Sequence, residues 1–420
     1  MTSGSRERSA PSTGTKMIPP RTLAGLPSPC YLIDLAALRR NLELLGRLRR
    51  ELDLKILLAL KSFACWRLAP IILRHLDGVN AASIHEARLG LAEFGGEVHL
   101  TAPAYSRADM DELFRRLAAR PEPPPFYLVF NSLSQWRRYG RECRDRGLRC
   151  GLRVNPERPL GRMPIYDPSR PGSRLGVIRA ELDAIAPGEL EGLTGLHFHV
   201  LCEQGADALA LALEAFEEKF GHLLSRMEWV NFGGGHHLTR LRGLHPELPI
   251  EEDYDLELLG RLVRDFRARH PLRIYLEPGE AVTLGAGCLV ATVLDIVERD
   301  LPTVILDASA EAHMPDVIEA PYTPPVAGAR PWCADGPAPA NTYRLTGNTC
   351  LAGDVIGTYV FEEPLAIGSK VVFQDQAYYT MVKNNTFNGI NLPAIALLYE
   401  DGFAETIRQF GYEDYRSRLS

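Results

Sequence analysis

The chain carries the short apolar segment Lys55-Ile-Leu-Leu-Ala-Leu-Lys61-Ser-Phe63. Its Leu-rich middle is typical of a buried strand, and the strand ends in an amine. Lysines are few in a chain that strongly favours arginine, so we interpret Lys61 as a residue with a specific role and not as an ordinary surface charge. Burial disfavours the ammonium form and makes the amine a better nucleophile toward carbonyl groups. The alternative is a lysine whose stem lies along the strand end while its charge reaches water.

Similar strands follow this segment at regular spacing, from about Leu35 to about Gly285. The predicted strands are Ile56–Leu60, Gly78–Ala82, Val98–Thr101, Phe126–Phe130, Arg149–Val154, Gly195–His199, Trp229–Phe232 and Arg273–Leu276. Amphipathic helices are predicted between most of them, at Ile84–Phe94, Ser106–Ala119, Ser132–Arg146, Ala206–Ser225 and Asp255–His270. Roughly eight alternating units of this kind predict a TIM (β/α)8 barrel.

After about Gly287 the helical periodicity mostly ends. Short runs with Gly and Pro turns predict antiparallel strands, at Cys288–Glu298, Thr303–Asp307, Asp354–Phe361 and Lys370–Gln374. The predicted fold class is therefore α/β plus β, a TIM barrel followed by a C-terminal β-barrel-like domain. We assign residues 36–286 to the barrel, and residues 21–35 and 287–420 to the β domain. Residues 1–20 are rich in Ser, Thr, Arg and Pro, which predicts a disordered leader rather than a signal peptide.

Composition excludes several classes of function. A formal net charge of −6 argues against nucleic acid as a partner and is compatible with a cationic ligand. The eight cysteines form no CxxC pair, which argues against a metal site and a disulfide framework and favours a reducing cytoplasm. No apolar run is long enough for a membrane span, so no membrane is expected as a partner.

Residues that carry chemistry follow the predicted strands, where a TIM barrel places its active site. The stretches are Lys61, His199 in Gly195-Leu-His-Phe-His199, Gly233-Gly234-Gly235, and Glu277-Pro-Gly279-Glu280. This set suits pyridoxal 5'-phosphate: Lys61 would attach the aldehyde, the glycine N–H groups would bind the phosphate, Glu277 would face the ring nitrogen, and His199 would stack on the ring. Alone, each residue has a structural alternative: a core histidine, a tight glycine turn or a loop salt bridge. Their joint placement after successive strands favours the cofactor site, to which we also assign Gly279.

The β domain adds three further stretches. In Gly347-Asn-Thr-Cys350-Leu-Ala-Gly-Asp354, a cysteine and an aspartate could serve as proton donor and amine anchor, or Cys350 could be an inert buried residue. Tyr378, in Gln376-Ala-Tyr378, could reach a phosphate or simply pack. A Pro-broken acidic stretch could line a site for a substrate with several ammonium groups, or be a solvated loop; its acids are Asp307, Glu311, Asp316 and Glu319.

Together these residues resemble the fold type III pyridoxal phosphate enzymes, and within them the carboxynorspermidine (carboxyspermidine) decarboxylases. The resemblance covers about Pro29 to Leu398. It rests on Leu58–Phe63, Ser83–Gly90, Leu196–Glu203, Asn231–His237, Leu276–Glu280, Asp307–Pro321, Gly347–Asp354 and Phe387-Asn-Gly389. The wider group usually has an arginine where this chain has Glu280, and often an acid where it has Leu351. Both departures are typical of the carboxynorspermidine branch, and both weaken ornithine as the substrate.

The resemblance implies decarboxylation of carboxynorspermidine or carboxyspermidine to norspermidine or spermidine in polyamine biosynthesis. It implies that Cys350 reprotonates Cα, with Lys61 as competitor. Asp354 and Asp307 would hold distal amines, with help from Glu311 and Asp316. A cytoplasmic homodimer with two shared active sites is expected, in which the partner subunit supplies the Cys350 loop.

Two alternatives stay open. One is another enzyme of the group, such as a diaminopimelate or ornithine decarboxylase or a racemase. A racemase is expected to have a tyrosine at Cys350, and a diaminopimelate enzyme an arginine for the distal carboxylate. The other is a catalytically dead regulator, although Lys61, His199, Glu277 and Cys350 are all present.

Overall fold

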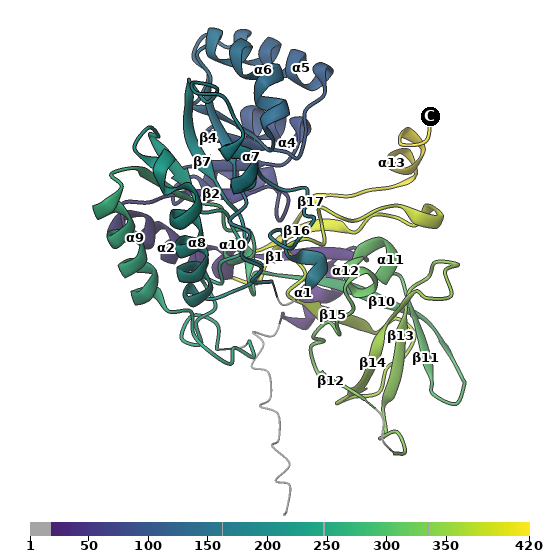
Figure 1. Cartoon of the computed structure of the whole chain (residues 1–420). Helices are drawn as coiled ribbons and strands as arrows, with labels where there is room; N and C mark the ends of the chain where they lie inside the picture. The colour runs from purple at the N-terminus through teal and green to yellow at the C-terminus, as the bar shows by residue number, and fades with distance from the viewer. Residues whose placement is uncertain (1–17, 162, 247, 334–335) are drawn as a thin grey trace, which may run out of the picture.

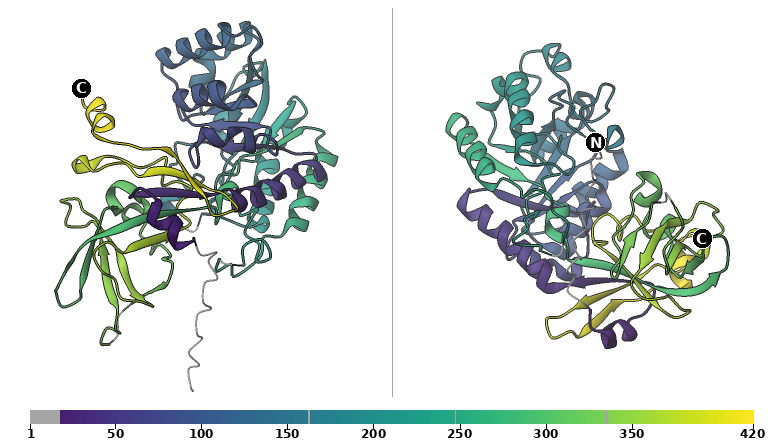
Figure 2. Two further views of the ribbon diagram at one scale, coloured as in Figure 1. Left: turned by 180° about the vertical axis from the view of Figure 1, so that it is seen from behind. Right: turned by 90° about the horizontal axis from the view of Figure 1, so that it is seen from below.

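The computed structural model of the chain describes residues 18–161, 163–246, 248–333 and 336–420. It contains a helix-wrapped barrel, at the upper left of Figure 1, and a large sheet at the lower right. Figure 2 shows the same two parts from behind and from below. Most of the predicted leader lies outside the described residues, and helix α1 (Pro20–Gly25) already begins at its last residue.

Within the described residues, eight parallel strands close a barrel, which confirms the predicted fold class. They are β2 (Lys55–Ala59), β3 (Gly78–Ala81), β4 (Glu97–Thr101), β5 (Phe126–Phe130), β6 (Arg149–Arg153), β7 (Leu193–His197), β8 (Trp229–Asn231) and β9 (Arg273–Leu276). The ring closes where β2 pairs with β9, with Lys55 beside Tyr275. The main helices around it are α2 (Leu35–Glu51), α4 (Ile84–Leu89), α5 (Arg107–Ala118), α6 (Leu133–Asp145), α7 (Arg179–Asp183), α8 (Ala206–Leu224) and α9 (Leu256–Arg269).

Local sequence explains where several helices begin. Ser106 caps α5 by accepting a hydrogen bond from the Asp109 N–H, and the Asp109 carboxylate accepts one from the Ser106 N–H, which is a capping box. Ser83 and Ser132 cap α4 and α6 in the same way through their hydroxyl groups. Strand β5 is buried along its whole length, as expected for a parallel strand covered by helices.

The second part is a nine-stranded sheet, counted over the described residues, with the order β12-β14-β13-β11-β10-β1-β16-β17 and β15 on β10. Its strands are β1 (Cys30–Asp34), β10 (Gly287–Val297), β11 (Thr303–Leu306), β12 (Ala329–Pro331), β13 (Thr342–Thr346), β14 (Val355–Phe361), β15 (Lys370–Gln374), β16 (Ala394–Leu398) and β17 (Ala404–Arg408). The sequence predicted antiparallel strands for this sheet. Most pairs are antiparallel, but β1 runs parallel to β16 and β11 runs parallel to β13. These pairs join strands that are distant in sequence, so no hairpin forces them to be antiparallel.

Large aromatic rings fill the barrel interior. Trp229 is fully buried there, and its ring occupies the space that side chains would take at Gly151 and Gly195. A Cβ at Gly195 would lie 2.0 Å from the Trp229 ring, so β7 needs glycine at this position. No helix of the described residues is long and apolar enough to cross a membrane.

Candidate active site

Lys61 lies two residues after β2, at the carboxyl end of the barrel. Its Nζ is 3.1 Å from Nε2 of His199. Solvent reaches the Lys61 side chain, although protein surrounds it on most sides. Desolvation by this surrounding protein lowers the pKa of Lys61, and the nearby Arg153 guanidinium lowers it further. The arrangement therefore favours a neutral, nucleophilic amine, as predicted for this residue.

His199 does not end its strand, contrary to the predicted bounds. Strand β7 ends at His197, because its neighbour β8 ends at Asn231, the residue paired with His197. His199 therefore lies in the following loop, where it faces Lys61. Desolvation, together with Lys61 and Arg153, holds the pKa of His199 well below its usual value, so the ring is neutral.

Glu277 follows β9 directly, and its side chain is almost fully buried. Its carboxylate accepts a hydrogen bond of 2.5 Å from Nδ2 of Asn231 and lies 3.3 Å from Nε2 of His197. Burial alone would raise the pKa of Glu277, but His197, His99 and Lys61 outweigh it and hold the pKa at about 2. Glu277 therefore presents an ionised carboxylate at the carboxyl end of the barrel.

Sequence reasoning missed Arg153, His197 and Asn231, which complete the surroundings of Glu277. Each is the last residue of a barrel strand, a signal that could have found them. Arg153 donates to the His199 carbonyl oxygen at 3.4 Å. Desolvation lowers the pKa of Arg153 to about 10, while Glu277 opposes this shift.

The glycine run lies between the loops that follow β7 and β9. Gly233 and Gly235 have φ angles of 76° and 80°, which favour glycine. A Cβ at Gly234 would lie 2.3 Å from the Glu277 carbonyl oxygen, and one at Gly235 would lie 2.1 Å from that of Leu201. Within the described residues, the Gly234 and Gly235 N–H groups donate to no protein acceptor. These free donors, in a loop that admits no side chain, fit a phosphate group.

Gly279 lies against the loop that carries Lys61. A Cβ at Gly279 would lie 2.5 Å from Cβ of Ser62, so glycine at this position lets the two loops touch. The next residue, Glu280, is buried and pairs with His237 Nδ1 at 2.8 Å and with Arg240 Nε at 2.7 Å. An arginine is therefore present beside Glu280, supplied by the loop after β8.

Tyr378 lies near this arginine and donates a hydrogen bond to Asp375 at 2.8 Å. Asp375 also accepts the Gly285 N–H, which joins the two parts of the chain. Burial raises the pKa of Asp375 to about 6; the Gly285 and Tyr378 hydrogen bonds oppose the rise and Glu280 adds to it. A second link runs from the Tyr379 N–H to the Ser62 carbonyl oxygen.

The Cys350 loop is held by its own aspartate. Asp354 is buried and accepts hydrogen bonds from the Ser309 hydroxyl at 2.8 Å and the Thr349 hydroxyl at 2.6 Å. Cys350 is exposed, and its N–H donates to Oδ1 of Asn388. Within the described residues, no hydrogen bond or ion pair joins Cys350 to the barrel, so the structure does not bring it together with Lys61 in one chain.

The predicted acidic stretch is largely engaged by the protein itself. Asp307 follows β11 and accepts the Thr292 N–H at 2.7 Å. Asp316 and Glu319, both in helix α12 (Asp316–Glu319), pair with Nζ of Lys383. Glu311 is half-buried in helix α11 (Ala310–His313), and its side chain makes no hydrogen bond or ion pair within the described residues.

Sequence reasoning also missed Glu203, in the loop after β7. Its φ of 53° is unusual for a residue other than glycine. Its carboxylate has no hydrogen bond or ion pair in the described part of the chain. Although solvent reaches Glu203, desolvation by the surrounding protein raises its pKa, and Glu280 and Asp375 raise it further; Glu203, Glu280 and Asp316 also act on Tyr379, so several acids lie near this tyrosine.

Comparisons with known proteins give matches over nearly the whole chain. A family model described as pyridoxal-dependent decarboxylase, C-terminal sheet domain, matches residues 30–377. A carboxyaminopropylagmatine decarboxylase from Synechocystis is 40% identical over 400 residues, covering 94% of this chain and 96% of that protein. A carboxynorspermidine/carboxyspermidine decarboxylase from Campylobacter jejuni is 40% identical over 398 residues, covering 93% of this chain and 98% of that protein.

Solved structures of decarboxylases have the same fold as this chain. The crystal structure of carboxynorspermidine decarboxylase complexed with norspermidine, from Campylobacter jejuni, has a TM-score of 0.81 at 39% identity and covers 93% of this chain and 99% of that one. A diaminopimelate decarboxylase from Helicobacter pylori shares the fold, with a TM-score of 0.79 at 15% identity, covering 95% of this chain and 98% of that one.

Proposed function

The chain belongs to the pyridoxal-dependent decarboxylase family, and we propose that it removes the carboxylate of a carboxylated polyamine. The proposed substrates are carboxynorspermidine and carboxyspermidine, and the products are norspermidine and spermidine. The observation that carries this proposal is near full-length similarity, at 39–40% identity, to a relative named for these substrates and to a solved structure that holds norspermidine. The protein is an enzyme and uses pyridoxal 5'-phosphate.

The residues of the site fit this cofactor. Lys61 would hold it covalently, the N–H groups of Gly234 and Gly235 would bind its phosphate with Tyr378, Glu277 would face its ring nitrogen, and His199 would lie against its ring. When bound, the cofactor supplies an electron sink for the bond to the departing carboxylate.

The protein residues then have defined tasks. Lys61, whose lowered pKa favours the neutral and nucleophilic amine, would attach the cofactor aldehyde and would yield it to the amine of the substrate. Glu277 stays ionised and would stabilise a proton on the ring nitrogen. We propose Cys350 as the group that returns a proton to Cα, with Lys61 as the competing donor.

Acidic side chains suit a substrate that carries several ammonium groups. Glu203, Glu280 and Asp316 all interact electrostatically with Tyr379, which lies next to the Lys61 loop. Among the acids predicted from the sequence, Glu311 is our choice for direct contact with a distal amine, and Asp316 would join it by exchanging its ion pair with Lys383 for one with the substrate. We propose that Asp307 and Asp354 act indirectly, because their carboxylates already bind the protein.

Carboxyaminopropylagmatine is a second candidate substrate. The Synechocystis relative named for it is as similar to this chain as the Campylobacter relative is, at 40% identity. Carboxyaminopropylagmatine ends in a guanidinium group, which stays charged and binds carboxylates through two parallel hydrogen bonds in one plane. A triamine ends in a single ammonium group, so the two substrates differ in shape more than in charge.

We propose a cytoplasmic homodimer with shared active sites and no nucleic-acid or membrane partner. The Cys350 loop carries exposed apolar residues, Leu351 and Val355, and Phe387 lies exposed in the adjoining turn (η4, Phe387–Gly389). This surface suits an interface with a second copy whose Lys61 it would approach. Mixing the inactive Lys61→Ala protein with the slowed Cys350→Ala protein under subunit exchange should then add about a quarter of wild-type activity, because half of the dimers gain one intact site. No recovery despite proven exchange would contradict the shared site.

The first experiment is carbon dioxide release by purified protein with added pyridoxal phosphate. The substrates are carboxynorspermidine, carboxyspermidine, carboxyaminopropylagmatine, ornithine, lysine and meso-diaminopimelate. Turnover of a carboxylated triamine supports the first proposal, and preference for the agmatine derivative supports the second. Turnover of an amino acid alone would overturn both, and no turnover at all would favour a regulatory protein.

A further inference from the structure

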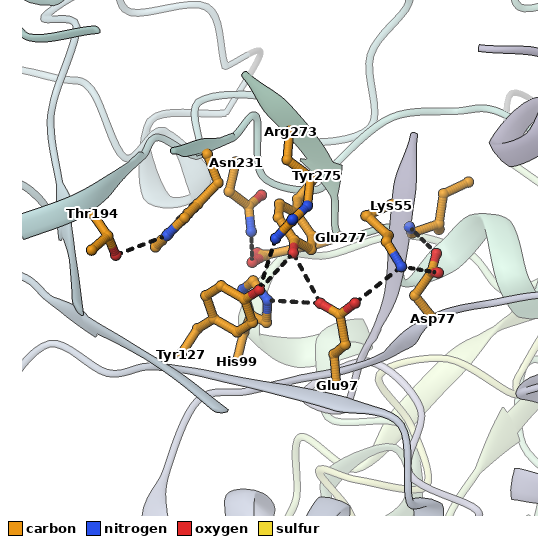
Figure 3. A network of polar contacts seen from close by, with 12 residues as sticks. Lys55, Asp77, Glu97, His99, Tyr127, Thr194, Asn231, Arg273, Tyr275 and Glu277 are labelled. Atoms are coloured by element: carbon orange, nitrogen blue, oxygen red, sulfur yellow. Dashed lines mark hydrogen bonds and ion pairs between the residues drawn. The ribbon is translucent and has the colours of Figure 1, made fainter. Parts of the chain in front are cut away.

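A closed ring of hydrogen bonds joins the two loops that are proposed to hold the cofactor. The Glu277 N–H donates to the Gly233 carbonyl oxygen at 2.9 Å, and the Gly233 N–H donates to Oδ1 of Asn231 at 2.8 Å. Nδ2 of Asn231 then donates to Oε1 of Glu277 at 2.5 Å, which closes the ring. Figure 3 shows this last bond, with the Asn231 side chain directed at the Glu277 carboxylate.

Asn231 is the last residue of β8, and it is completely buried. Its partners fix the orientation of its amide group. The Gly233 N–H can only donate, so it faces the amide oxygen, and the ionised carboxylate of Glu277 can only accept, so it faces the amide nitrogen. The ring therefore needs a side chain at this position that accepts and donates at the same time.

The two bonds of the Asn231 amide lead to the two ends of the proposed cofactor site. Gly233 begins the glycine run, whose following N–H groups, at Gly234 and Gly235, are proposed to bind the phosphate. Glu277 is proposed to face the ring nitrogen. A hydrogen bond to an ionised group is stronger than a neutral one, and more so in a buried site. The Glu277 carboxylate therefore cannot turn without disturbing the glycine run.

We propose that Asn231 is a positioning residue that ties the Glu277 carboxylate to the glycine run, and so fixes the spacing between the groups that bind the ring nitrogen and the phosphate. This inference rests on the proposed function, in which these groups hold the cofactor. It adds that their alignment depends on a third side chain. Such alignment matters because binding groups must lie within about 0.5 Å of their productive positions.

The alternative is that Asn231 only satisfies buried polar groups and so stabilises the fold. Asn231→Leu has nearly the same size and removes both side-chain bonds of the ring. Thr239→Val is the matched control. Thr239 is completely buried, and its hydroxyl donates to the Ala281 carbonyl oxygen at 3.0 Å. This bond also joins the loop after β8 to the segment after β9, but it lies outside the ring.

Three quantities are measured: cofactor affinity, by absorbance titration of cofactor-free protein with pyridoxal phosphate; the nitrogen-15 chemical shift of the ring nitrogen with labelled cofactor; and kcat with KM. In Asn231→Leu we expect cofactor affinity and kcat each to fall roughly tenfold or more, the effect of losing a hydrogen bond to a charged group. The shift should move toward the value of an unprotonated pyridine, because Glu277 can turn away. Thr239→Val should stay close to wild type in all three.

Asn231→Asp provides a pH signature that a purely structural role would not produce. Two buried carboxyl groups at hydrogen-bond distance share one proton, because ionising both is costly. While the proton is kept, the introduced carboxyl accepts from Gly233 and donates to Glu277, as the amide does. When the proton leaves, the two carboxylates repel each other. The kcat relative to wild type should therefore fall as the pH rises, and the nitrogen shift should change with it. Taking the ratio to wild type removes the titrations of His197 and Lys61, which both proteins share.

Each contrary result has a distinct meaning. If wild-type protein binds no cofactor, or binds it with an unprotonated ring nitrogen, the proposed role of Glu277 fails, and the inference about Asn231 falls with it. If the wild-type nitrogen is protonated but Asn231→Leu matches Thr239→Val in affinity and shift, Asn231 is only structural and the proposed function stands. If Asn231→Leu does not fold, as judged by circular dichroism, Asn231→Asp decides, and a constant ratio to wild type across the pH range overturns the inference. If neither variant folds, the role is structural and the inference is overturned as well.

Discussion

Replacing Gly234 with alanine tests how closely the glycine loop and Glu277 must approach each other. A Cβ at this position would lie 2.3 Å from the Glu277 carbonyl oxygen, whereas real Cβ contacts stay above 3.0 Å. The two backbones must therefore separate by roughly 0.7 Å or more in a close-packed region. Both are backbone segments, so no flexible side chain can absorb the shift.

The movement would displace the residue proposed to face the cofactor ring and the N–H groups proposed to bind its phosphate. Overpacking of this kind costs roughly 1–3 kcal/mol. If that cost falls on the bound state, cofactor affinity should weaken roughly 5- to 150-fold. Gly234 has no positive φ, so the effect is steric and not a matter of backbone strain.

Gly243→Ala is the matched control, since Gly243 lies in the same loop after β8 and a Cβ there meets nothing within 4 Å. The assay is titration of cofactor-free protein with pyridoxal phosphate, followed by absorbance, with thermal unfolding measured in parallel. The reasoning is refuted if Gly234→Ala binds the cofactor within twofold of Gly243→Ala.

Three further predictions concern single residues. Lys61→Ala should abolish covalent attachment of the cofactor and slow turnover by orders of magnitude without unfolding the protein; near wild-type activity would overturn the central assignment. Cys350→Ala should slow or misdirect protonation of the product, whereas an unchanged rate and product ratio would mean that the thiol is structural. Asp375→Asn should gain stability relative to wild type as the pH rises. The raised pKa of Asp375 penalises its charged form in the folded protein, and this penalty grows between the usual carboxyl pKa of 3.8 and about 6. Thermal unfolding from pH 4 to 8 checks this, and a constant difference between the two proteins would contradict it.

Much of the barrel could be predicted from the sequence, because its strands are short apolar runs that turn residues interrupt. β5 and β9 have the predicted bounds. β7 was placed two residues too late, since the apolar pattern continues to Val200 although the neighbouring strand has ended. The parallel pairs of the second sheet were missed because they join strands far apart in sequence, which no local pattern records.

The predicted site residues differ in the same way: those at strand ends follow from the local sequence pattern, and those with remote partners do not. Lys61, His199 and Glu277 come together at one end of the barrel, because topology alone places strand ends there. The acidic stretch was harder to interpret, because its partners are remote in sequence. Lys383 neutralises Asp316 from 67 residues away, and this pairing appears only in three dimensions. Glu203 was missed for the opposite reason, since nothing in the local sequence shows that its side chain lies unpaired among other acids.

The carboxylate of Glu203, which is unpaired within the described residues and lies near Tyr379, bears on the alternatives that the sequence left open. Diaminopimelate carries a second carboxylate, which would face the unpaired Glu203 without gaining a counter-charge, since Arg240 is already paired with Glu280 and Lys383 with Asp316. A carboxylated polyamine places ammonium groups there instead, and one beside Glu203 would offset the desolvation and the repulsion from Glu280 that raise the pKa of this carboxyl. Repulsion between like charges costs the wrong substrate as much as attraction favours the right one. The unpaired carboxylate of Glu203 therefore favours a cationic group over a second carboxylate at this place.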